Sequence, residues 1–287
     1  MKLEKIQGFL GRCGASAASL LKVALLSRRP SPSGRRKDGA IVIMGNGPSL
    51  RQTIDGRGDW LRSHDLLAVN FAANTPDFFS LRPRYYVLAD GHFFSGVSTD
   101  PNVGRLWEAI SSVGWEMTLW VDRKYRALAE KLLKGNGMVT VKVFNLTPLE
   151  GWDWLVGRLV DLGMGMPRPR NVMIPAIMVA IREGYRKIYL CGADHSWTKT
   201  LSVDDENFVV SVQPHFYKDN SEEHKRVRSA YAGLRLHDVL GSMTVAFRSY
   251  WEIAKYCKSR GVEIINSTPG SMIDAFPRDP VAVSQAL

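Results

Sequence analysis

With 287 residues, 45% of them hydrophobic, the chain is long enough to bury one sizeable core with an added segment. Its formal net charge of +10 is concentrated in residues 1–37, where nine Lys or Arg stand against one Glu. The other 29 basic and 27 acidic residues leave the body nearly neutral, so we do not expect nucleic acid as a partner. The three cysteines, Cys13, Cys191 and Cys257, have no metal-type spacing and cannot all pair, which indicates inert thiols in a reducing compartment.

The first 37 residues predict a basic arm that associates with a membrane. Apolar residues recur at helical spacing from Ile6 to Ala24, and a Pro/Ser/Gly linker with five basic residues follows at 28–37. This pattern is typical of an amphipathic helix on an anionic membrane surface. We expect no membrane span, because Lys22 interrupts an apolar run that is too short, and no signal peptide, because no clear cleavage site follows. The alternative is a helix that packs on its own domain or on a partner subunit.

The next segment, residues 40–50, is the most informative part of the sequence. An apolar run that ends at Met44 predicts a buried strand, and the following Gly45-Asn46-Gly47-Pro48-Ser49 predicts a tight loop that can approach a ligand closely. We expect the backbone N–H groups and the side chains of Asn46 and Ser49 to point together at an anionic or sugar group. The alternative is a plain strand-to-helix turn, because short glycine motifs recur by chance.

Further β-rich runs alternate with helical patterns along the chain. The expected strands cover 66–70, 85–90, 118–122, 139–144, 188–194 and 262–266, and the expected helices cover 103–112, 124–134, 152–162, 172–183 and 243–258. This alternation predicts an α/β fold, a Rossmann-like doubly wound and mostly parallel sheet. We divide it into a core over 38–194, a lid or acceptor segment over 195–242, and a helix and strand over 243–287 that complete the core. Ligands of such sheets bind beyond the carboxyl ends of the strands, where Asn46, Asn70, Asp90 and Asp194 fall.

The segment 195–236 is too long for an ordinary connection, and so predicts a binding loop or lid. It holds or borders His195, His215, His224 and His237, and four histidines beside the strand-end Asp194 indicate an acid/base site. Each histidine alone is more often structural. No metal site is expected, because no His-x-x-x-His or similar ligand spacing occurs.

Several of these motifs together resemble the bacterial lipooligosaccharide sialyltransferases. The resemblance rests on Gly45-Asn-Gly-Pro-Ser-Leu50, the strand ending at Asn70, residues 176–194, Phe216-Tyr-Lys-Asp-Asn-Ser221 and residues 262–271, in order along 40–275. Other bacterial surface-polysaccharide proteins share the Gly-Asn-Gly-Pro-Ser-Leu type of motif. The family implies a metal-independent glycosyltransferase that uses a CMP-activated sialic acid, with a Rossmann-like domain and a lid.

Carried over to this sequence, the resemblance implies site residues. Gly45, Asn46, Gly47 and Ser49 would hold the cytidine nucleotide, Asn70 its phosphate or ribose, and Arg170 and Asn171 are the nearest polar residues to the family's nucleotide contacts before a long helix. Asp90 stands where the family has asparagine, and would bind a hydroxyl or amino group of the substrate. Tyr217 and Tyr231 would replace the family's tyrosines that hold the donor phosphate, and His195 is a further substrate-binding candidate. The catalytic base would be His237 by its place in the chain, with His215 as the competing choice and Asp194 as a third catalytic candidate.

These features predict a membrane-associated glycosyltransferase of surface polysaccharide synthesis, in the cytoplasm on the inner face of the membrane. It would transfer a nonulosonic acid or similar sugar from a CMP-linked donor to a glycan or lipid-linked glycan acceptor, without another cofactor and with histidine as base. An oligomer of identical chains is left open. Two alternatives remain: a magnesium-dependent pterin pyrophosphokinase-like enzyme, with Asp90 and Asp194 as metal ligands, and a non-catalytic nucleotide-sugar-binding subunit.

Overall fold

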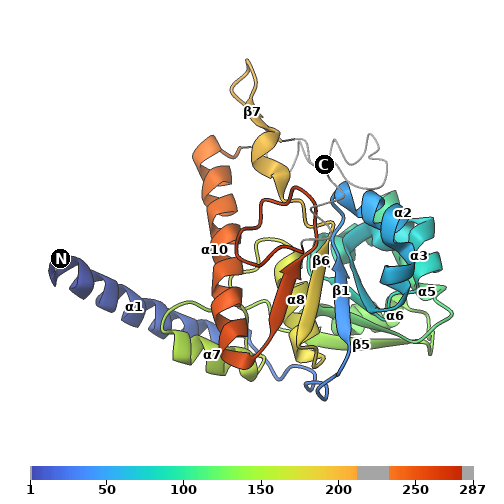
Figure 1. Cartoon of the computed structure of the whole chain (residues 1–287), viewed down its shortest axis with the longest axis horizontal. Helices are drawn as coiled ribbons and strands as arrows, with labels where there is room; N and C mark the ends of the chain where they lie inside the picture. Colours follow the sequence, from blue (N-terminus) through green and yellow to red (C-terminus); the bar gives the residue numbers. More distant parts are fainter. Residues whose placement is uncertain (1, 212–232, 280–287) are drawn as a thin grey trace.

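A seven-stranded, all-parallel sheet forms the centre of the protein (Figure 1). The structure is a computed structural model that describes residues 2–211 and 233–279. The strands are β1 (Ala40–Met44), β2 (Asp65–Val69), β3 (Tyr85–Leu88), β4 (Met117–Asp122), β5 (Val139–Phe144), β6 (Lys187–Cys191) and β9 (Glu263–Asn266). Their order is β5-β4-β3-β2-β1-β6-β9, so the chain leaves β1 in one direction as far as β5 and returns to its other side with β6. The predicted Rossmann-like α/β fold is confirmed, and its topological switch point lies between β1 and β6.

Helices cover both faces of this sheet, because alternate side chains of each strand enter two separate cores. Ile41 and Ile43 pack in one core with α8 (Met173–Arg182), whereas Val42 and Met44 pack in the other. The first core also receives α7 (Asp153–Asp161) and α10 (Leu236–Arg260). The second receives α2 (Ser49–Arg62), α3 (Pro76–Leu81), α4 (His92–Ser95), α5 (Pro101–Ser111) and α6 (Arg126–Leu132). Strands buried on both faces explain the continuous apolar runs of the sequence.

Two of the three cysteines belong to these cores. Cys191 ends β6 in the second core and Cys257 lies on α10 in the first. Burial raises the pKa of each thiol to about 12. Both therefore stay protonated at neutral pH, which agrees with the expectation of inert thiols.

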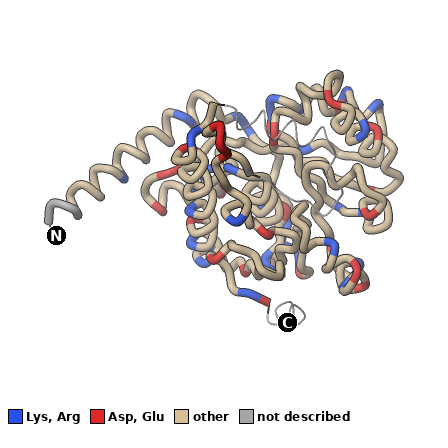
Figure 2. The backbone as a smooth tube through the Cα atoms, turned by 90° about the horizontal axis from the view of Figure 1, so that it is seen from above, with Lys and Arg blue, Asp and Glu red and all other residues tan. Residues whose placement is uncertain are grey.

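The N-terminal helix α1 (Lys2–Leu26) extends away from the body at its beginning and joins it toward its end (Figures 1 and 2). Ser16 accepts the backbone N–H of Trp152 at 3.0 Å, and Ser19 donates to the backbone carbonyl of Glu150 at 2.7 Å. The second half of α1 therefore packs on its own domain, as the alternative interpretation of the arm required. The stretch Ile6–Leu26 is long and apolar enough to cross a membrane by length and composition, which corrects the expectation of too short a run. A helix that spans a membrane over Ile6–Leu26 would have to break the contacts of Ser16 and Ser19 with the body.

The segment expected as a lid contains regular structure. The 3₁₀ turn η4 (Ser196–Lys199) leads into an antiparallel hairpin of β7 (Leu201–Val203) and β8 (Val209–Ser211). Val209 packs against Val239 and Met243 of α10, which ties the hairpin to that helix. Helix α10 begins at Leu236, so the expected boundary at residue 242 falls inside it. Residues 212–232, with His215, Tyr217 and His224, lie outside the described residues.

Candidate nucleotide-binding site

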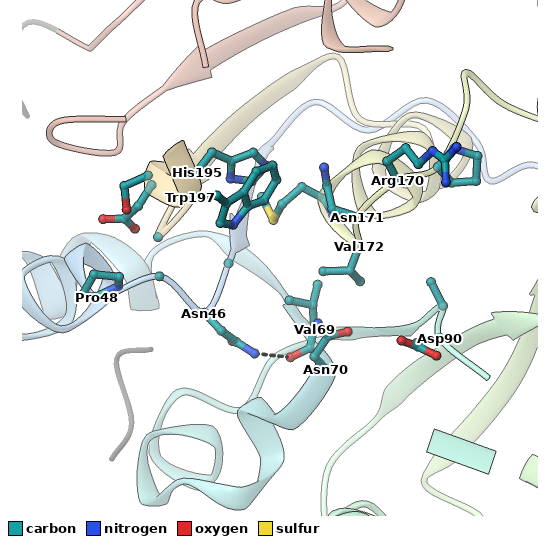
Figure 3. Close-up of a pocket in the computed structure, with 18 of the residues that line it drawn as sticks. Asn46, Pro48, Val69, Asn70, Asp90, Arg170, Asn171, Val172, His195 and Trp197 are labelled. Atoms are coloured by element: carbon teal, nitrogen blue, oxygen red, sulfur yellow. Dashed lines mark hydrogen bonds between the residues drawn. The ribbon is translucent and has the colours of Figure 1, made fainter. Parts of the chain in front are cut away.

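A cavity of about 370 Å³ opens at the carboxyl ends of β1 and β6, at the topological switch point. Polar lining residues come from four strand ends and from the start of α8, and Figure 3 shows them on two facing walls. One wall carries Asn46, Asn70 and Asp90, and the other carries Arg170, Asn171, His195 and Trp197. Gly45, Gly47 and Asp194 also line the cavity. The structure thus brings together most of the site residues predicted from sequence.

Glycine at positions 45, 47 and 192 lets the loops after β1 and β6 lie in direct contact. The N–H groups of Gly45 and Gly47 donate to the carbonyls of Cys191 and Gly192 at 2.8 and 2.9 Å. A Cβ atom on Gly47 would lie 1.9 Å from the Asp194 carboxylate, and one on Gly192 would lie 2.2 Å from the Gly45 carbonyl. The loop after β1 is therefore more than a plain turn, because its glycines allow close contact and hydrogen bonds with the residues that follow β6.

Ser49 holds Asp194 instead of pointing into the cavity. Its hydroxyl donates to Asp194 Oδ2 at 2.7 Å and its N–H to Oδ1 at 3.3 Å, in the first turn of α2. Burial raises the pKa of Asp194, and the hydrogen bonds from Ser49 oppose that rise. A helix N-terminus of this kind is where a ligand phosphate would otherwise bind, and here an internal carboxylate occupies it. The expectation that Ser49 points with Asn46 at a ligand is corrected, since Ser49 does not line the cavity.

Two amide side chains in the cavity wall each keep one buried atom without a partner among the described residues. Asn46 Nδ2 donates to the Val69 carbonyl at 3.1 Å, while Asn46 Oδ1 is unpaired. Asn171 Oδ1 accepts the Met173 N–H at 3.0 Å, while Asn171 Nδ2 is unpaired. Leaving such a buried group unpaired costs about 1–3 kcal/mol. The cavity therefore offers an acceptor on one wall and a donor on the other to a polar ligand.

A hydrogen-bond chain from α10 fixes the amide of Asn171. The N–H of Met173 donates to Asn171 Oδ1, which identifies this atom as the amide oxygen. The Tyr250 hydroxyl, 2.9 Å from the same oxygen, must therefore be a donor to it. His195 Nε2 lies 2.5 Å from the same hydroxyl and therefore carries the proton, which leaves Nδ1 as the lone-pair nitrogen. Trp197 covers the imidazole, with ring centroids 4.2 Å apart. The chain orients the Asn171 amide so that Nδ2 remains available as a donor.

Burial also decides the charge of His195, which adopts a left-handed backbone conformation with φ of 52°. Because it is buried, its pKa falls to about 3. His195 is therefore neutral at physiological pH. A general base works best with a pKa near the working pH, so His195 is suited to hydrogen bonding rather than to proton abstraction.

The opposite wall is built from two strand-end residues. Asn70 also has a left-handed backbone, with φ of 51°, and its carbonyl accepts the Tyr86 hydroxyl at 2.5 Å. Asp90 Oδ1 accepts the N–H of His92, the first residue of the short helix α4, at 2.9 Å. Both residues line the cavity. They can offer oxygen acceptors to a hydroxyl or amino group of a ligand.

Of the candidate bases, His237 does not line the cavity. It lies in the first turn of α10 with its side chain 83% exposed, and its Nε2 is 3.4 Å from Asp238. His215 and the substrate candidate Tyr217 fall outside the described residues, so all three roles stay predictions. Within 2–211 and 233–279, no group of three or more His, Cys, Asp or Glu side chains is placed to hold a metal ion.

Sequence reasoning missed the parts that Trp197 and Tyr250 play at this site. Tyr250 stands within a helical pattern as one more aromatic core residue, and its contact with His195 joins residues 55 positions apart. A hydroxyl on a fully buried helix face is the signal that could have found it, because such groups need partners. Trp197 lies in the turn η4, three residues after Asp194. An aromatic residue so close to a polar residue after a strand is the signal that could have indicated a ring in the cavity wall.

No family model matches this chain, and no curated protein matches it. Among solved structures, the chain is similar to the MAf glycosyltransferase from Magnetospirillum magneticum AMB-1, with 12% sequence identity and a TM-score of 0.49. The match covers 97% of this chain and 39% of that protein. The chain thus spans about two fifths of the length of the protein it matches.

Proposed function

We propose that the protein is a glycosyltransferase of bacterial surface polysaccharide synthesis. Its donor would be a CMP-activated nonulosonic acid or similar sugar, and its acceptor a hydroxyl of a glycan or lipid-linked glycan. The observation that carries the proposal is the cavity at the switch point, where the buried Asn46 Oδ1 and Asn171 Nδ2 have no hydrogen-bond partner among the described residues. Its volume of about 370 Å³ lies in the range of small-ligand sites.

The charges of the cavity favour one direction for the donor. Asp194 already occupies the N-terminus of α2, so a phosphate there would meet a carboxylate. At the other wall, Arg170 and the unpaired Asn171 amide precede the N-terminus of α8, where donors and the helix dipole favour an anion. We therefore place the donor phosphate at Arg170 and Asn171, and the nucleoside against the acceptor oxygens of Asn46 and Asn70.

This direction supports transfer chemistry. CMP leaves more readily when its phosphate is hydrogen-bonded by cationic or neutral donors, which Arg170 and Asn171 supply. The acceptor hydroxyl needs a base with a pKa near neutrality, and His237 and His215 remain the candidates. The arm would hold the enzyme at the inner face of the membrane, where lipid-linked acceptors are found.

The magnesium-dependent kinase alternative needs Asp90 and Asp194 as metal ligands. Both oxygens of Asp194 already accept hydrogen bonds from Ser49, and Asp90 Oδ1 accepts from His92. These contacts reduce the capacity of both carboxylates to coordinate an ion. They favour the transferase over the kinase.

The proposal can be tested by thermal shift with CMP, CDP, UDP, GDP and ATP, each with and without magnesium. We expect CMP to stabilise the protein without a metal, by about 2.7 kcal/mol at a concentration of 100 Kd. Stabilisation only by ATP with magnesium would transfer the proposal to the kinase. CMP-sugar binding without any turnover of the CMP-linked sugar would leave a non-catalytic binding subunit.

A variant pair tests the placement of the phosphate. Asn171→Asp keeps an oxygen for the Met173 and Tyr250 hydrogen bonds but replaces the free amide donor by a carboxylate oxygen. We expect it to lose about 1.5–3 kcal/mol of CMP binding, a roughly 10- to 150-fold weaker Kd. Asp90→Asn on the facing wall is the control and should bind CMP at least as well as the wild type. Equal CMP affinity of Asn171→Asp and the wild type would refute this placement.

A further inference from the structure

A second cavity, of about 190 Å³, shares no lining residue with the candidate nucleotide site. Three helices end at it, since the last residues of α7, α8 and α10 are the lining residues Asp161, Arg182 and Arg260. Its apolar wall is formed by Phe144, Val160, Met166, Met178 and Ile181. Its charged lining consists of Arg36, Arg182, Arg186, Arg260 and Asp161. The cavity therefore joins an apolar wall to a strong excess of positive charge.

Two of the four arginines already have internal partners. Arg260 binds Asp161 through two contacts, Nη2–Oδ2 at 2.7 Å and Nε–Oδ1 at 3.1 Å. Arg182 donates from Nε to the Ser31 carbonyl at 2.9 Å. As terminal residues of α10 and α8, both also offset the partial negative charge of these helix ends. The other two arginines are Arg36 and Arg186.

Arg36 and Arg186 make no side-chain hydrogen bond or salt bridge with the rest of the described chain. The backbone around Arg36 is nevertheless held in place, because the Gly34 N–H donates to the Arg182 carbonyl at 2.8 Å and the Lys37 N–H to the Gly184 carbonyl at 3.0 Å. The guanidinium groups of Arg36 and Arg186 thus remain available at one cavity, and guanidinium groups are suited to bind the oxygen pair of a phosphate.

The cavity adjoins the end of the membrane-associating helix. Pro30 lines it, only four residues after α1 ends at Leu26. Arg28 fixes this connection, because its N–H donates to Asn145 Oδ1 at 3.0 Å. Leu26 is 63% exposed, and Leu162, which precedes the lining residue Gly163, is 62% exposed. Exposed apolar side chains beside a cationic cavity are the arrangement expected at the boundary between lipid headgroups and acyl chains.

We propose that this cavity binds the phosphate headgroup of an anionic phospholipid. Arg36 and Arg186 would bind the phosphate, and the apolar wall would contact the glycerol and the first acyl carbons. The proposal rests on the membrane association in the proposed function and specifies its partner. It holds whether α1 lies on the bilayer or enters it, because in both cases the end of α1 is at the headgroup level. Free inorganic phosphate has the same chemistry, and the experiment separates it from lipid.

The test uses the full chain and dihexanoylphosphatidylglycerol below its critical micelle concentration, so that single lipid molecules bind. We expect a saturable thermal shift with this lipid, and none with dihexanoylphosphatidylcholine. Arg36→Ala/Arg186→Ala should weaken binding about 30-fold, at about fivefold for each basic residue removed. The control Arg105→Ala/Arg126→Ala removes the same charge on α5 and α6, away from the cavity, and should keep the wild-type affinity.

Three results would overturn the proposal. An equal shift with inorganic phosphate would identify a free-phosphate site. Equal losses in both double variants would mean diffuse attraction of charge, and unchanged binding in Arg36→Ala/Arg186→Ala would exclude the cavity. The CMP-dependent shift of the same variant reports separately on the first site, so failure here is distinguishable from failure of the proposed function. If the double variant does not fold, Arg36→Ala alone changes only an exposed side chain and should still weaken binding about fivefold.

Discussion

Acid should destabilise this protein partly through His195. Burial holds the pKa of its imidazole at about 3, whereas an unfolded chain returns it to about 6.5. Since the folded pKa is the lower one, the neutral imidazole contributes stability above pH 6.5, and this contribution is lost as the pH falls toward 3. At pH 5 the unfolded chain binds nearly one more proton at this position than the folded chain does, whereas at pH 7 the difference is only about a quarter of a proton. The resulting loss in the free energy of unfolding is about 2 kcal/mol.

The measurement is urea unfolding of the wild type and two variants at pH 7 and pH 5. Asn is the replacement of choice at 195, because it tolerates the left-handed backbone and carries no group that titrates between pH 5 and pH 7. His195→Asn should lose about 2 kcal/mol less than the wild type on acidification. His237→Asn removes a histidine whose side chain is 83% exposed, and should follow the wild type within about 0.5 kcal/mol. Identical pH dependence of His195→Asn and the wild type would refute the argument that a buried neutral imidazole links folding to pH.

Three further predictions address the loop, the arm and the base. Gly47→Ala should lower the free energy of unfolding by about 1–3 kcal/mol, because its Cβ would lie 1.9 Å from the Asp194 carboxylate. Gly56→Ala, whose Cβ would have no neighbour within 4 Å, should raise the free energy of unfolding by about 0.5–1 kcal/mol. Equal urea midpoints of the two variants would contradict this reasoning. Removing residues 1–15, which leaves the hydrogen bonds of Ser16 and Ser19 with the body in place, should weaken binding to anionic vesicles at least about tenfold in a sedimentation assay, and unchanged binding would exclude the arm. One of His237→Ala and His215→Ala should reduce sugar transfer by roughly 10²–10⁴-fold with nearly unchanged CMP affinity; near-normal turnover in both would exclude a histidine base at these positions.

The sequence alone was sufficient for the sheet and for the edge of the sheet at which the cavity opens. Runs of β-branched and aromatic residues predicted the strands, and Gly45 and Gly47 after the first run predicted a close backbone approach, because these signals are local. The same local signals indicated that polar residues after successive parallel strands, such as Asn46, Asn70 and Asp90, would meet at one edge. The start of α10 was placed seven residues too late, at Met243, because Val239 packs against Val209 of the β7–β8 hairpin, which is distant in the sequence.

Only the tertiary structure decided what each polar side chain does there. Ser49 and Asp194 are 145 positions apart, and because of their contact an internal carboxylate occupies the helix end where an anionic or sugar group was expected. Tyr250 orients Asn171 from 79 positions away, and it also shows which nitrogen of His195 carries the proton. The second cavity likewise joins Arg36 and Arg186, which are 150 positions apart. Periodicity and spacing describe neighbours along the chain, whereas hydrogen bonds and buried charge depend on which distant segments the packed core brings into contact.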